Sequence, residues 1–316
     1  MEKKATAIDK KSTRQAYSDA LVSIGVNRNI VVMDADMSKH TMTYDFSQKY
    51  PDRFFNAGIA EANMMSVAAG LASAGKTVFV STLAVFAAGR AYEQIRCSIC
   101  YPKLNVKVCA THGGIAIGED GASHQMIEDI ALMRVIPNMC VISPADYYEA
   151  KASVEFVASV DGPFYVRLGR LAMPTIFDED YKFKFGRGIE LRKGKDITII
   201  ATGLMTAQAL EAANLLEQKN ISARVINIHT IKPIDIDIIV KAARETRAIV
   251  TAEEHSVIGG LGGAVAEVTA AYAPVRMGFV GMSDTFGRSG KPVDLFKFYG
   301  LTAENIVNTV YKLLNN

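Results

Sequence analysis

Short apolar segments alternate with longer alanine-rich segments along most of this 316-residue chain. Five apolar segments in the first half have the length of buried β-strands, at residues 30–36, 77–82, 104–111, 139–145 and 163–169. Four segments between them have helical periodicity, at residues 61–75, 90–102, 124–136 and 146–159. Apolar strands separated by helices indicate a mainly parallel sheet that helices cover on both faces. The first half is therefore predicted to be an α/β domain.

A change in composition follows this domain. Residues from about 170 to 196 are charged and show weak strand and helix signals, as expected of a linker with a few extended pieces. Strand-like and helical segments then alternate again, at residues 196–203, 206–220, 223–231, 235–246, 248–255 and 262–273. We expect two three-layer α/β domains, with a first domain at residues 1–172, a linker at 173–193 and a smaller second domain at 194–316.

The charge and the apolar pattern exclude several classes of protein. The chain has 35 basic and 33 acidic residues and a net charge of +2, so neither nucleic acid nor an anionic membrane is expected as its main partner. No apolar run reaches the roughly 18 residues of a membrane span. The first 17 residues are charged and lack the apolar core of a secretion signal. A cytoplasmic enzyme fits these properties.

The chain has four cysteines, Cys97, Cys100, Cys109 and Cys140. The first two form a C-x-x-C pair, but no second pair at metal-ligand spacing and no histidine cluster accompany it in the sequence. We expect a reduced, buried set of thiols that holds no metal.

Glu61 is the single charged residue in the stretch NAGIAEAN, residues 56–63. A carboxylate among small apolar residues is costly unless a cation or a hydrogen-bond donor meets it. That partner has to come from elsewhere in the chain or from a ligand.

Four long segments together resemble the C-terminal half of transketolase, a thiamine-diphosphate enzyme. These segments are FSQKYPDRFFNAGIAEANMMSVAAGLA (46–72), VSTLAVFAAGRAYEQIR (80–96), THGGIAIGEDGASHQMIEDIA (111–131) and FGRSGKPVDLF (286–296). They occur in the family's order and at similar spacing over almost the whole chain, which is more specific than any short motif. The resemblance implies a domain that binds the pyrimidine ring of the cofactor, followed by a transketolase C-terminal domain.

The resemblance also implies which residues meet thiamine diphosphate. Glu61 resembles the family's catalytic glutamate, which hydrogen-bonds N1′ of the aminopyrimidine and so promotes loss of the thiazolium C2 proton. Phe86 resembles the aromatic residue on which this ring stacks, and Asp36 and Tyr92 are further candidates close to the cofactor. Leu83 stands where the family tends to carry an aromatic residue, so this wall is expected to be less aromatic here. By this resemblance, the donor for Glu61 is the cofactor.

Polar residues after the third predicted strand resemble the substrate-binding residues of transketolase. His112 matches the position that faces the phosphate end of the substrate, and Asp120 matches one that binds a sugar hydroxyl. His124, the second catalytic candidate, matches a position near the ketose oxygen. Arg14 and Arg170 fall where the family keeps phosphate-binding arginines.

Two positions at the phosphate end leave alternatives open. Arg167 lies close enough to Arg170 in the sequence to be the arginine that binds phosphate instead. A serine contact of the family aligns with His40 or with the nearby Ser38. The histidines of the second domain receive no catalytic role, and His255 is expected at an interface or a helix cap.

Part of a complete active site is absent from the sequence. Thiamine enzymes hold the diphosphate through Mg²⁺, with a GDG motif followed about thirty residues later by asparagines, and GEDG at residues 118–121 does not match this pattern. We therefore expect a split transketolase, in which an N-terminal partner subunit binds the diphosphate and Mg²⁺ or Ca²⁺. The short charged lead-in after Met1 favours a natural subunit over a fragment. A homodimer of this chain with two partner chains would form an α2β2 assembly.

The expected reaction transfers a two-carbon ketol unit from a ketose phosphate to an aldose phosphate, as in the pentose phosphate pathway. The 1-deoxyxylulose-5-phosphate synthases and the beta subunits of 2-oxoacid dehydrogenases share the two-domain plan and are alternatives. His112 within THGGIAIGEDG, together with RSGKPVDLF, favours transketolase. A non-catalytic binding protein on the same fold is the alternative from another class.

Overall fold

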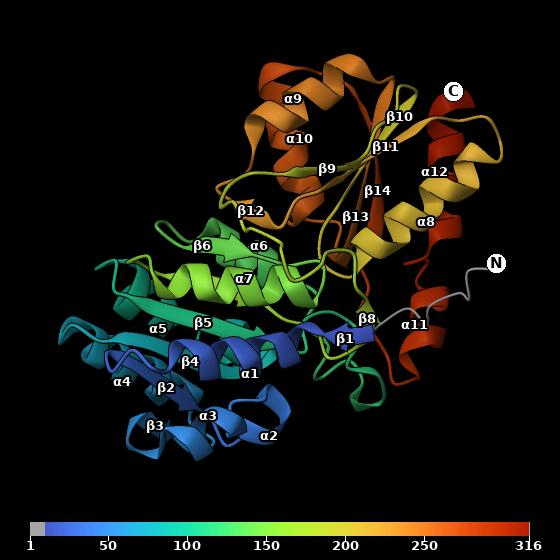
Figure 1. Cartoon of the computed structure of the whole chain (residues 1–316). Helices are drawn as coiled ribbons and strands as arrows, with labels where there is room; N and C mark the ends of the chain where they lie inside the picture. The colour runs from blue at the N-terminus through green and yellow to red at the C-terminus, as the bar shows by residue number, and fades with distance from the viewer. Residues whose placement is uncertain (1–9, 316) are drawn as a thin grey trace, which may run out of the picture.

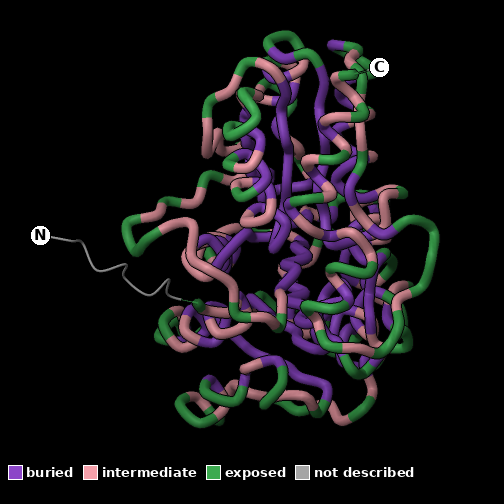
Figure 2. The backbone as a smooth tube through the Cα atoms, turned by 90° about the vertical axis from the view of Figure 1, so that its right-hand side faces the viewer, coloured by how far each residue is buried: buried purple, intermediate pink, exposed green. Residues whose placement is uncertain are grey.

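The computed structural model describes residues 10–315, which form two α/β units that lie one above the other in Figure 1. Residues 1–9 of the predicted first domain and residue 316 of the second lie outside the described residues. Buried backbone runs through the middle of both units, and most exposed residues lie at their periphery (Figure 2). Within residues 10–315, no helix is both long enough and apolar enough to cross a membrane.

The lower unit in Figure 1 contains a seven-stranded sheet with the strand order β12-β6-β7-β5-β4-β2-β3. Its strands are β2 (Ile30–Asp34), β3 (Phe54–Asn56), β4 (Thr77–Leu83), β5 (Val106–Thr111), β6 (Cys140–Ile142), β7 (Phe164–Arg167) and β12 (Thr230–Lys232). All neighbours pair in parallel except β12, which is antiparallel to β6 at the edge. Each of the five segments predicted as strands in the first half contains one of these strands, except that β4 extends one residue beyond its segment, to Leu83. The predicted mainly parallel α/β domain is therefore confirmed.

Helices cover both faces of this sheet. They are α1 (Thr13–Ile24), α2 (Ser38–Thr41), α3 (Tyr44–Lys49), α4 (Glu61–Ser73), α5 (Tyr92–Gln94), α6 (Asp129–Val135) and α7 (Tyr147–Ala158), with the short turns η1 (Pro51–Arg53), η2 (Val85–Arg90), η3 (Ile95–Cys100) and η4 (Gly118–Asp120). Successive strand residues point to opposite faces. On β2, Val31 and Met33 therefore join the core beneath α4, while Ile30 and Val32 join the core beneath α1 and α7.

Two predicted helical segments differ from the structure. Residues 90–102 contain α5 and the π-helical turn η3 rather than one α-helix, and a second π-helical turn, η2, ends at the start of this segment. Within residues 124–136, α6 begins only at Asp129, because the preceding residues form a loop in which Met126 bridges to Gly114. The helical spacing of apolar residues in these segments reflects burial on one side, which a π-turn or a loop also produces.

The upper unit contains a five-stranded sheet with the order β14-β13-β10-β11-β9. Its strands are β9 (Ile189–Arg192), β10 (Ile197–Ala201), β11 (Ala223–Asn227), β13 (Ala248–Ser256) and β14 (Arg276–Met282). Its helices are α8 (Met205–Glu217), α9 (Ile236–Glu245), α10 (Leu261–Tyr272), α11 (Pro292–Phe298) and α12 (Ala303–Asn315). Buried residues of α8 and α12 pack on one face of this sheet, and those of α9 and α10 pack on the other. The second three-layer α/β unit is therefore also confirmed.

Strand pairing links the two units. The segment 223–231, predicted as one strand, divides: β11 stays in the upper sheet, and β12 pairs with β6 of the lower sheet. Strand β9 lies in the predicted linker and pairs antiparallel with β11. A separate two-stranded sheet consists of β1 (Lys10–Ser12) and β8 (Ala172–Pro174). Side-chain patterns identify a strand but not its partner, which is why the crossing of β12 was not predicted.

Candidate active site

A cavity of about 430 Å³ opens at the carboxyl ends of the parallel strands of the lower sheet. Ligands bind at this edge in open α/β sheets, because the loops that follow the strands converge there. Six residues predicted to bind cofactor or substrate line the cavity: His40, Phe86, His112, Asp120, His124 and Arg170. The fold thus gathers at one place residues from the loops after β2, β4, β5 and β7.

One end of this cavity is basic. Arg14 donates from Nη1 to the backbone carbonyl of His40 at 3.0 Å. Arg170 donates from Nη1 to the carbonyl of Ile117 at 2.6 Å. Burial lowers the pKa of Arg14, and the positive charge of Arg170 adds to the shift. Burial, with further contributions from these two arginines, lowers the pKa of His112 to about 3. His112 is therefore neutral near pH 7, and the arginines supply most of the positive charge.

The two alternative phosphate-binding arginines have different surroundings. Arg170 is exposed and lines the cavity. Arg167 is buried, and its Nε lies 2.8 Å from Oδ2 of Asp129 in an ion pair. Burial would lower the pKa of Arg167, but Asp129 and Glu254 together hold that pKa above its ordinary value. Arg167 is thus fixed within the protein, which favours Arg170 as the arginine that meets a substrate.

An aromatic side chain forms another wall of the cavity. The ring of Phe86 meets the ring of His124 edge-on, with centroids 5.5 Å apart. The guanidinium of Arg90 also packs on the ring of Phe86, 4.8 Å from the ring centroid. The two residues are neighbours because both belong to the π-helical turn η2. Leu83 at the end of β4 adds an aliphatic surface to the wall. The Oγ of Ser123 lies 3.0 Å from Nδ1 of His124.

Glu61 lies at the start of α4 and is only 3% exposed. It does not line the cavity. It connects to the cavity wall through Arg90, whose Nη1 lies 3.4 Å from Oε2 of Glu61 and whose guanidinium rests on Phe86. The chain therefore supplies one donor to Glu61, and the expectation that the cofactor donates to it stays a prediction. Arg90 was not among the predicted residues, although its position four residues after Phe86 could have indicated that the two side chains are neighbours.

Besides Glu61 and Arg14, three other predicted residues lie away from the cavity lining. Asp36 is exposed, and its backbone adopts the left-handed conformation, with φ of 62°. Its carboxylate accepts a hydrogen bond from the side-chain amide of Asn56 at 3.0 Å. Tyr92 is half-buried and packs against the core of the lower unit. Ser38, the alternative to His40, begins α2 and is not one of the lining residues. Of these two alternatives, His40 is therefore the one that reaches the cavity.

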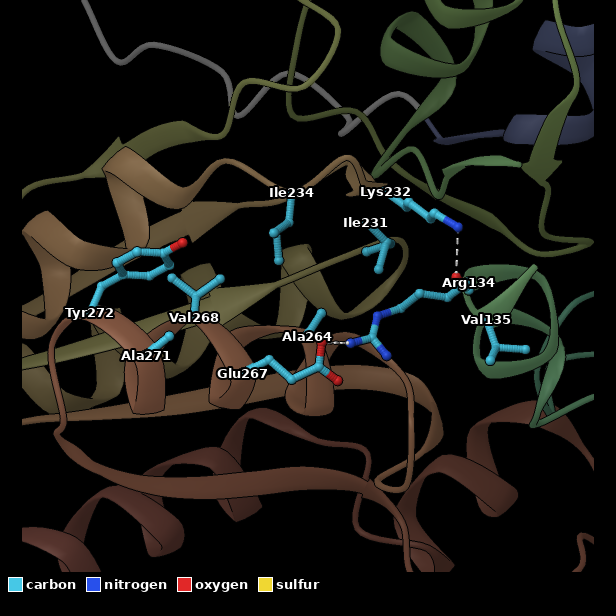
Figure 3. A pocket seen from close by; sticks show the side chains of 10 residues that line it. All are labelled: Arg134, Val135, Ile231, Lys232, Ile234, Ala264, Glu267, Val268, Ala271 and Tyr272. Atoms are coloured by element: carbon cyan, nitrogen blue, oxygen red, sulfur yellow. Dashed lines mark hydrogen bonds and ion pairs between the residues drawn. The ribbon is translucent and has the colours of Figure 1, made fainter. Parts of the chain in front are cut away.

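A second cavity, of about 580 Å³, lies between α6, β12 and α10 (Figure 3). Its charged side chains already have partners in the protein. Lys232 donates from Nζ to the carbonyl of Arg134 at 2.9 Å, and the guanidinium of Arg134 forms an ion pair with Glu267. None of the predicted site residues lines this cavity.

The four cysteines form no disulfide. Cys100 is buried, and burial raises its pKa to about 12. Cys97 is exposed and Cys140 is only half-buried, so the prediction that all four thiols are buried is wrong for these two residues. For Cys97 the reason is geometric, since it lies on the outward side of η3 while Cys100 faces the core.

Comparison with known proteins agrees with this geometry. The family model of the transketolase pyrimidine-binding domain matches residues 9–175, and that of the transketolase C-terminal domain matches residues 186–306. The chain belongs to the transketolase family. It is 50% identical to a candidate transketolase C-terminal section of Methanocaldococcus jannaschii, with 95% of each chain covered. It is 40% identical to a 6-deoxy-6-sulfo-D-fructose transketolase subunit of a Clostridium species, with 95% of this chain and 94% of that subunit covered.

A solved structure shows the same likeness to transketolase. A split-gene transketolase, described as an inactive beta4 tetramer, shares 55% identity and superposes with a TM-score of 0.88 over 96% of this chain and 98% of that one. Transketolases depend on thiamine diphosphate, whose diphosphate is held through a metal ion. Within residues 10–315, no three histidine, cysteine, aspartate or glutamate side chains are arranged to hold a metal.

Proposed function

We propose that this chain is the C-terminal subunit of a two-component, thiamine-diphosphate-dependent transketolase. In this proposal it supplies the pyrimidine-binding half of the active site and helps to transfer a ketol unit from a ketose phosphate to an aldose phosphate. The main support is the convergence of His112, Asp120, His124 and Arg170 with Phe86 in one cavity. Donors for an anion, polar groups for hydroxyls and an aromatic wall are what a sugar phosphate and a heterocycle together require.

The residues present fit the pyrimidine part of the cofactor. Glu61 is a buried carboxylate whose protein partner, Arg90, lies at the long distance of 3.4 Å, so it keeps capacity to accept a stronger hydrogen bond. Phe86 is half-buried at the cavity wall and offers a ring for stacking. When bound, thiamine diphosphate supplies a nucleophilic carbon and an electron sink for breaking the C2–C3 bond of the ketose.

The residues of this chain would bind and orient the sugar and hold protons in place. Glu61 would hold the pyrimidine nitrogen protonated, because a charge-assisted hydrogen bond at a buried site favours that form. The neutral ring of His112 can donate or accept a hydrogen bond without adding charge. His124, buttressed by Phe86 and in contact with Ser123, would face the ketose oxygen.

The basic end of the cavity would receive the anionic end of the sugar. Arg170 is exposed there and His40 also lines the cavity. Arg14 donates a hydrogen bond to the carbonyl of His40 and lies close enough to Arg170 for the charge of Arg170 to lower its pKa. A guanidinium binds phosphate through parallel N–H groups. Since a related subunit is named for a sulfonated sugar, the shared feature that we propose is an anionic end group, and phosphate is our choice for this chain.

The diphosphate and Mg²⁺ or Ca²⁺ would be bound by an N-terminal partner subunit. Two copies of each chain would form an α2β2 assembly, with a homodimer of this chain, in the cytoplasm. This proposal is supported by the two relatives that are transketolase sections or subunits of similar length and by the split-gene structure.

The test is a reconstituted assay. The full chain is co-purified with a protein that carries the GDG motif and downstream asparagines, and two substrate pairs are compared. We expect turnover with xylulose 5-phosphate and ribose 5-phosphate. Turnover with pyruvate and glyceraldehyde 3-phosphate instead would show a deoxyxylulose-synthase-like enzyme. If calorimetry detects no thiamine diphosphate binding with or without the partner, the proposal is wrong. The result would favour the alternative of a non-catalytic protein on the same fold.

A further inference from the structure

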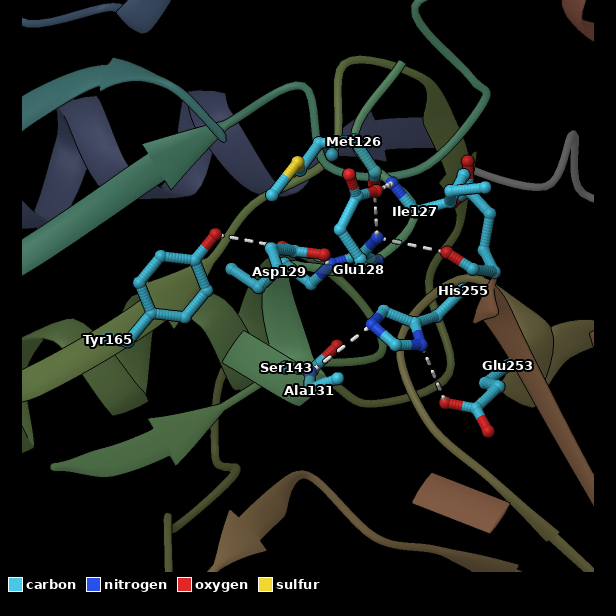
Figure 4. A network of polar contacts seen from close by, with 12 residues as sticks. Met126, Ile127, Glu128, Asp129, Ala131, Ser143, Tyr165, Glu253 and His255 are labelled. Atoms are coloured by element: carbon cyan, nitrogen blue, oxygen red, sulfur yellow. Dashed lines mark hydrogen bonds and ion pairs between the residues drawn. The ribbon is translucent and has the colours of Figure 1, made fainter. Parts of the chain in front are cut away.

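Three consecutive residues of β13 have side chains that contact elements outside the upper sheet. Glu253, Glu254 and His255 are buried, with 1%, 3% and 0% of their surface exposed. Glu253 accepts hydrogen bonds at the N-terminus of α10, including one from the Leu261 N–H at 2.7 Å. His255 accepts from the Ala131 N–H in the first turn of α6 at 3.3 Å (Figure 4), which confirms its expected capping role. Glu254, which lies between them, turns to neither helix.

Glu254 contacts the loop that lines the candidate active site. Its Oε1 accepts a hydrogen bond from the backbone N–H of Ala116 at 2.8 Å, within buried surroundings. Ala116 belongs to the loop of residues 112–121, which carries His112 and Asp120 into the cavity. The carboxylate belongs to the upper unit and the loop to the lower one, so this contact crosses between the units.

The backbone of Glu254 is itself held in place. Arg167 donates from Nη2 to the Glu254 carbonyl at 2.9 Å, and from Nε to Asp129 at 2.8 Å. Tyr165 donates to the same carboxylate oxygen of Asp129 at 2.8 Å (Figure 4). Glu254 is therefore joined through its backbone carbonyl to a connected, buried network of Arg167, Asp129 and Tyr165.

Two glycines show how closely the loop rests on this network. A β-carbon at Gly113 would lie 2.7 Å from Nε of Arg167, and one at Gly114 would collide with the carboxylate of Glu254. Gly114 also has φ of +83°, and His112 has φ of 62°. A loop with left-handed residues and adjacent glycines has little intrinsic preference for one shape. Its shape must come from contacts outside the loop.

We propose that Glu254 is a positioning residue that fixes the loop 112–121, so that His112 and Asp120 face the cavity. The C-terminal domain thereby shapes the substrate site of the pyrimidine-binding domain. This inference rests on the proposed function for its effect on catalysis, because the cavity matters to turnover only as the substrate site. Its structural part, the hold of Glu254 on the loop, can be tested independently.

The experiment compares matched shortenings of two neighbouring glutamates in the full chain. Glu254→Asp keeps the charge but withdraws the acceptor from Ala116, and Glu253→Asp makes the same change toward α10. Hydrogen–deuterium exchange is measured for residues 112–118 and for the start of α10. We expect E254D to speed exchange in the loop by about tenfold to a hundredfold, the range for a hydrogen bond to a charged group. We expect E253D to speed exchange at α10 and to leave the loop within about threefold of wild type.

A conservative variant and kinetics complete the test. Glu254→Gln keeps an oxygen acceptor of the same reach but makes it neutral, so loop exchange should speed by less than in E254D, by about tenfold at most. With the partner subunit present, E254D should raise KM for the ketose phosphate by about tenfold or more relative to E253D. Unchanged loop exchange in E254D, or the same exchange pattern in E253D and E254D, would overturn the proposal. If the wild-type complex transfers no ketol unit, the proposed function fails, and the exchange data still decide whether Glu254 holds the loop.

Discussion

Replacing Glu61 with glutamine keeps the size of the side chain and removes its charge. Glu61 is 3% exposed, and its ion-pair partner Arg90, at 3.4 Å, has 56% of its own side chain exposed. An ion pair at this long distance, with one partner exposed to solvent, contributes roughly 1 kcal/mol or less to stability. We therefore expect E61Q to fold, with a free energy of unfolding within about 1 kcal/mol of wild type.

The expected loss of activity is much larger. In the proposed function, Glu61 accepts a charge-assisted hydrogen bond from the pyrimidine ring, and such a bond contributes roughly 1.5–3 kcal/mol, or about ten- to a hundredfold in affinity. A group that also controls the position of a proton contributes roughly two to four orders of magnitude to turnover. We expect turnover of E61Q to fall by about that amount at saturating cofactor.

The assay measures kcat of the reconstituted complex and urea unfolding of each variant. Arg90→Met is the control, because it removes the protein's own donor and leaves the carboxylate. Its turnover should stay within about tenfold of wild type. If E61Q keeps more than about a tenth of wild-type turnover, or if both variants lose the same amount, Glu61 serves only its pair with Arg90.

Four further predictions concern residues of the cavity and its support. Phe86→Ala removes the stacking surface, and calorimetry on the complex should show a loss of about threefold to tenfold in thiamine diphosphate affinity. Arg170→Met should raise KM for a ketose phosphate by roughly tenfold to a hundredfold in steady-state kinetics, whereas KM for the unphosphorylated sugar should not change. Arg167→Met leaves the carboxylate of Asp129 buried without its cation, and urea unfolding should show a loss of about 3–5 kcal/mol. The ring of His112, with its pKa lowered to about 3, should remain neutral at pH 5 and above in an NMR titration. Inorganic phosphate in the cavity should raise this pKa by offsetting the arginines.

The predictions for Arg170 and His112 both concern the basic end of the cavity. Burial, together with the charges of Arg14 and Arg170, lowers the pKa of His112, so the histidine stays uncharged beside the two arginines. An anion would therefore meet two fixed positive charges and one neutral hydrogen-bonding ring. This arrangement binds phosphate over a wide pH range, since neither arginine loses its proton near neutrality.

Several secondary-structure elements could be predicted from the sequence because their signals are local. The segments 30–36 and 77–82 became β2 and β4, since a continuous apolar run can be satisfied only by burial on both faces. Helix α12 was not predicted, although buried Ile306 and Val310 have helical spacing. Strand β14 (residues 276–282) was also missed, because Arg276, Gly278 and Gly281 interrupt its apolar pattern.

The candidate site was predicted in part. Matching segments placed His112, Asp120 and His124 on one loop, and the structure gathers them in one cavity. The sequence left open which arginine lies beside them. The structure separates Arg170 at the cavity from Arg167 in a buried ion pair. Two arginines three residues apart look alike in a sequence, because burial and partner depend on residues distant in the chain.

The sequence by itself determined the type of fold, the order of its segments and the family to which they belong. Periodicity is a property of neighbours in the chain, so it survives without knowledge of the fold. Only the tertiary structure decided that β12 joins the lower sheet, that Arg90 meets Glu61 and that Glu254 meets Ala116. Buried charges and backbone donors must find partners wherever the packed chain provides them. The partner of Glu254 lies 138 residues away, and no local pattern records such a distance.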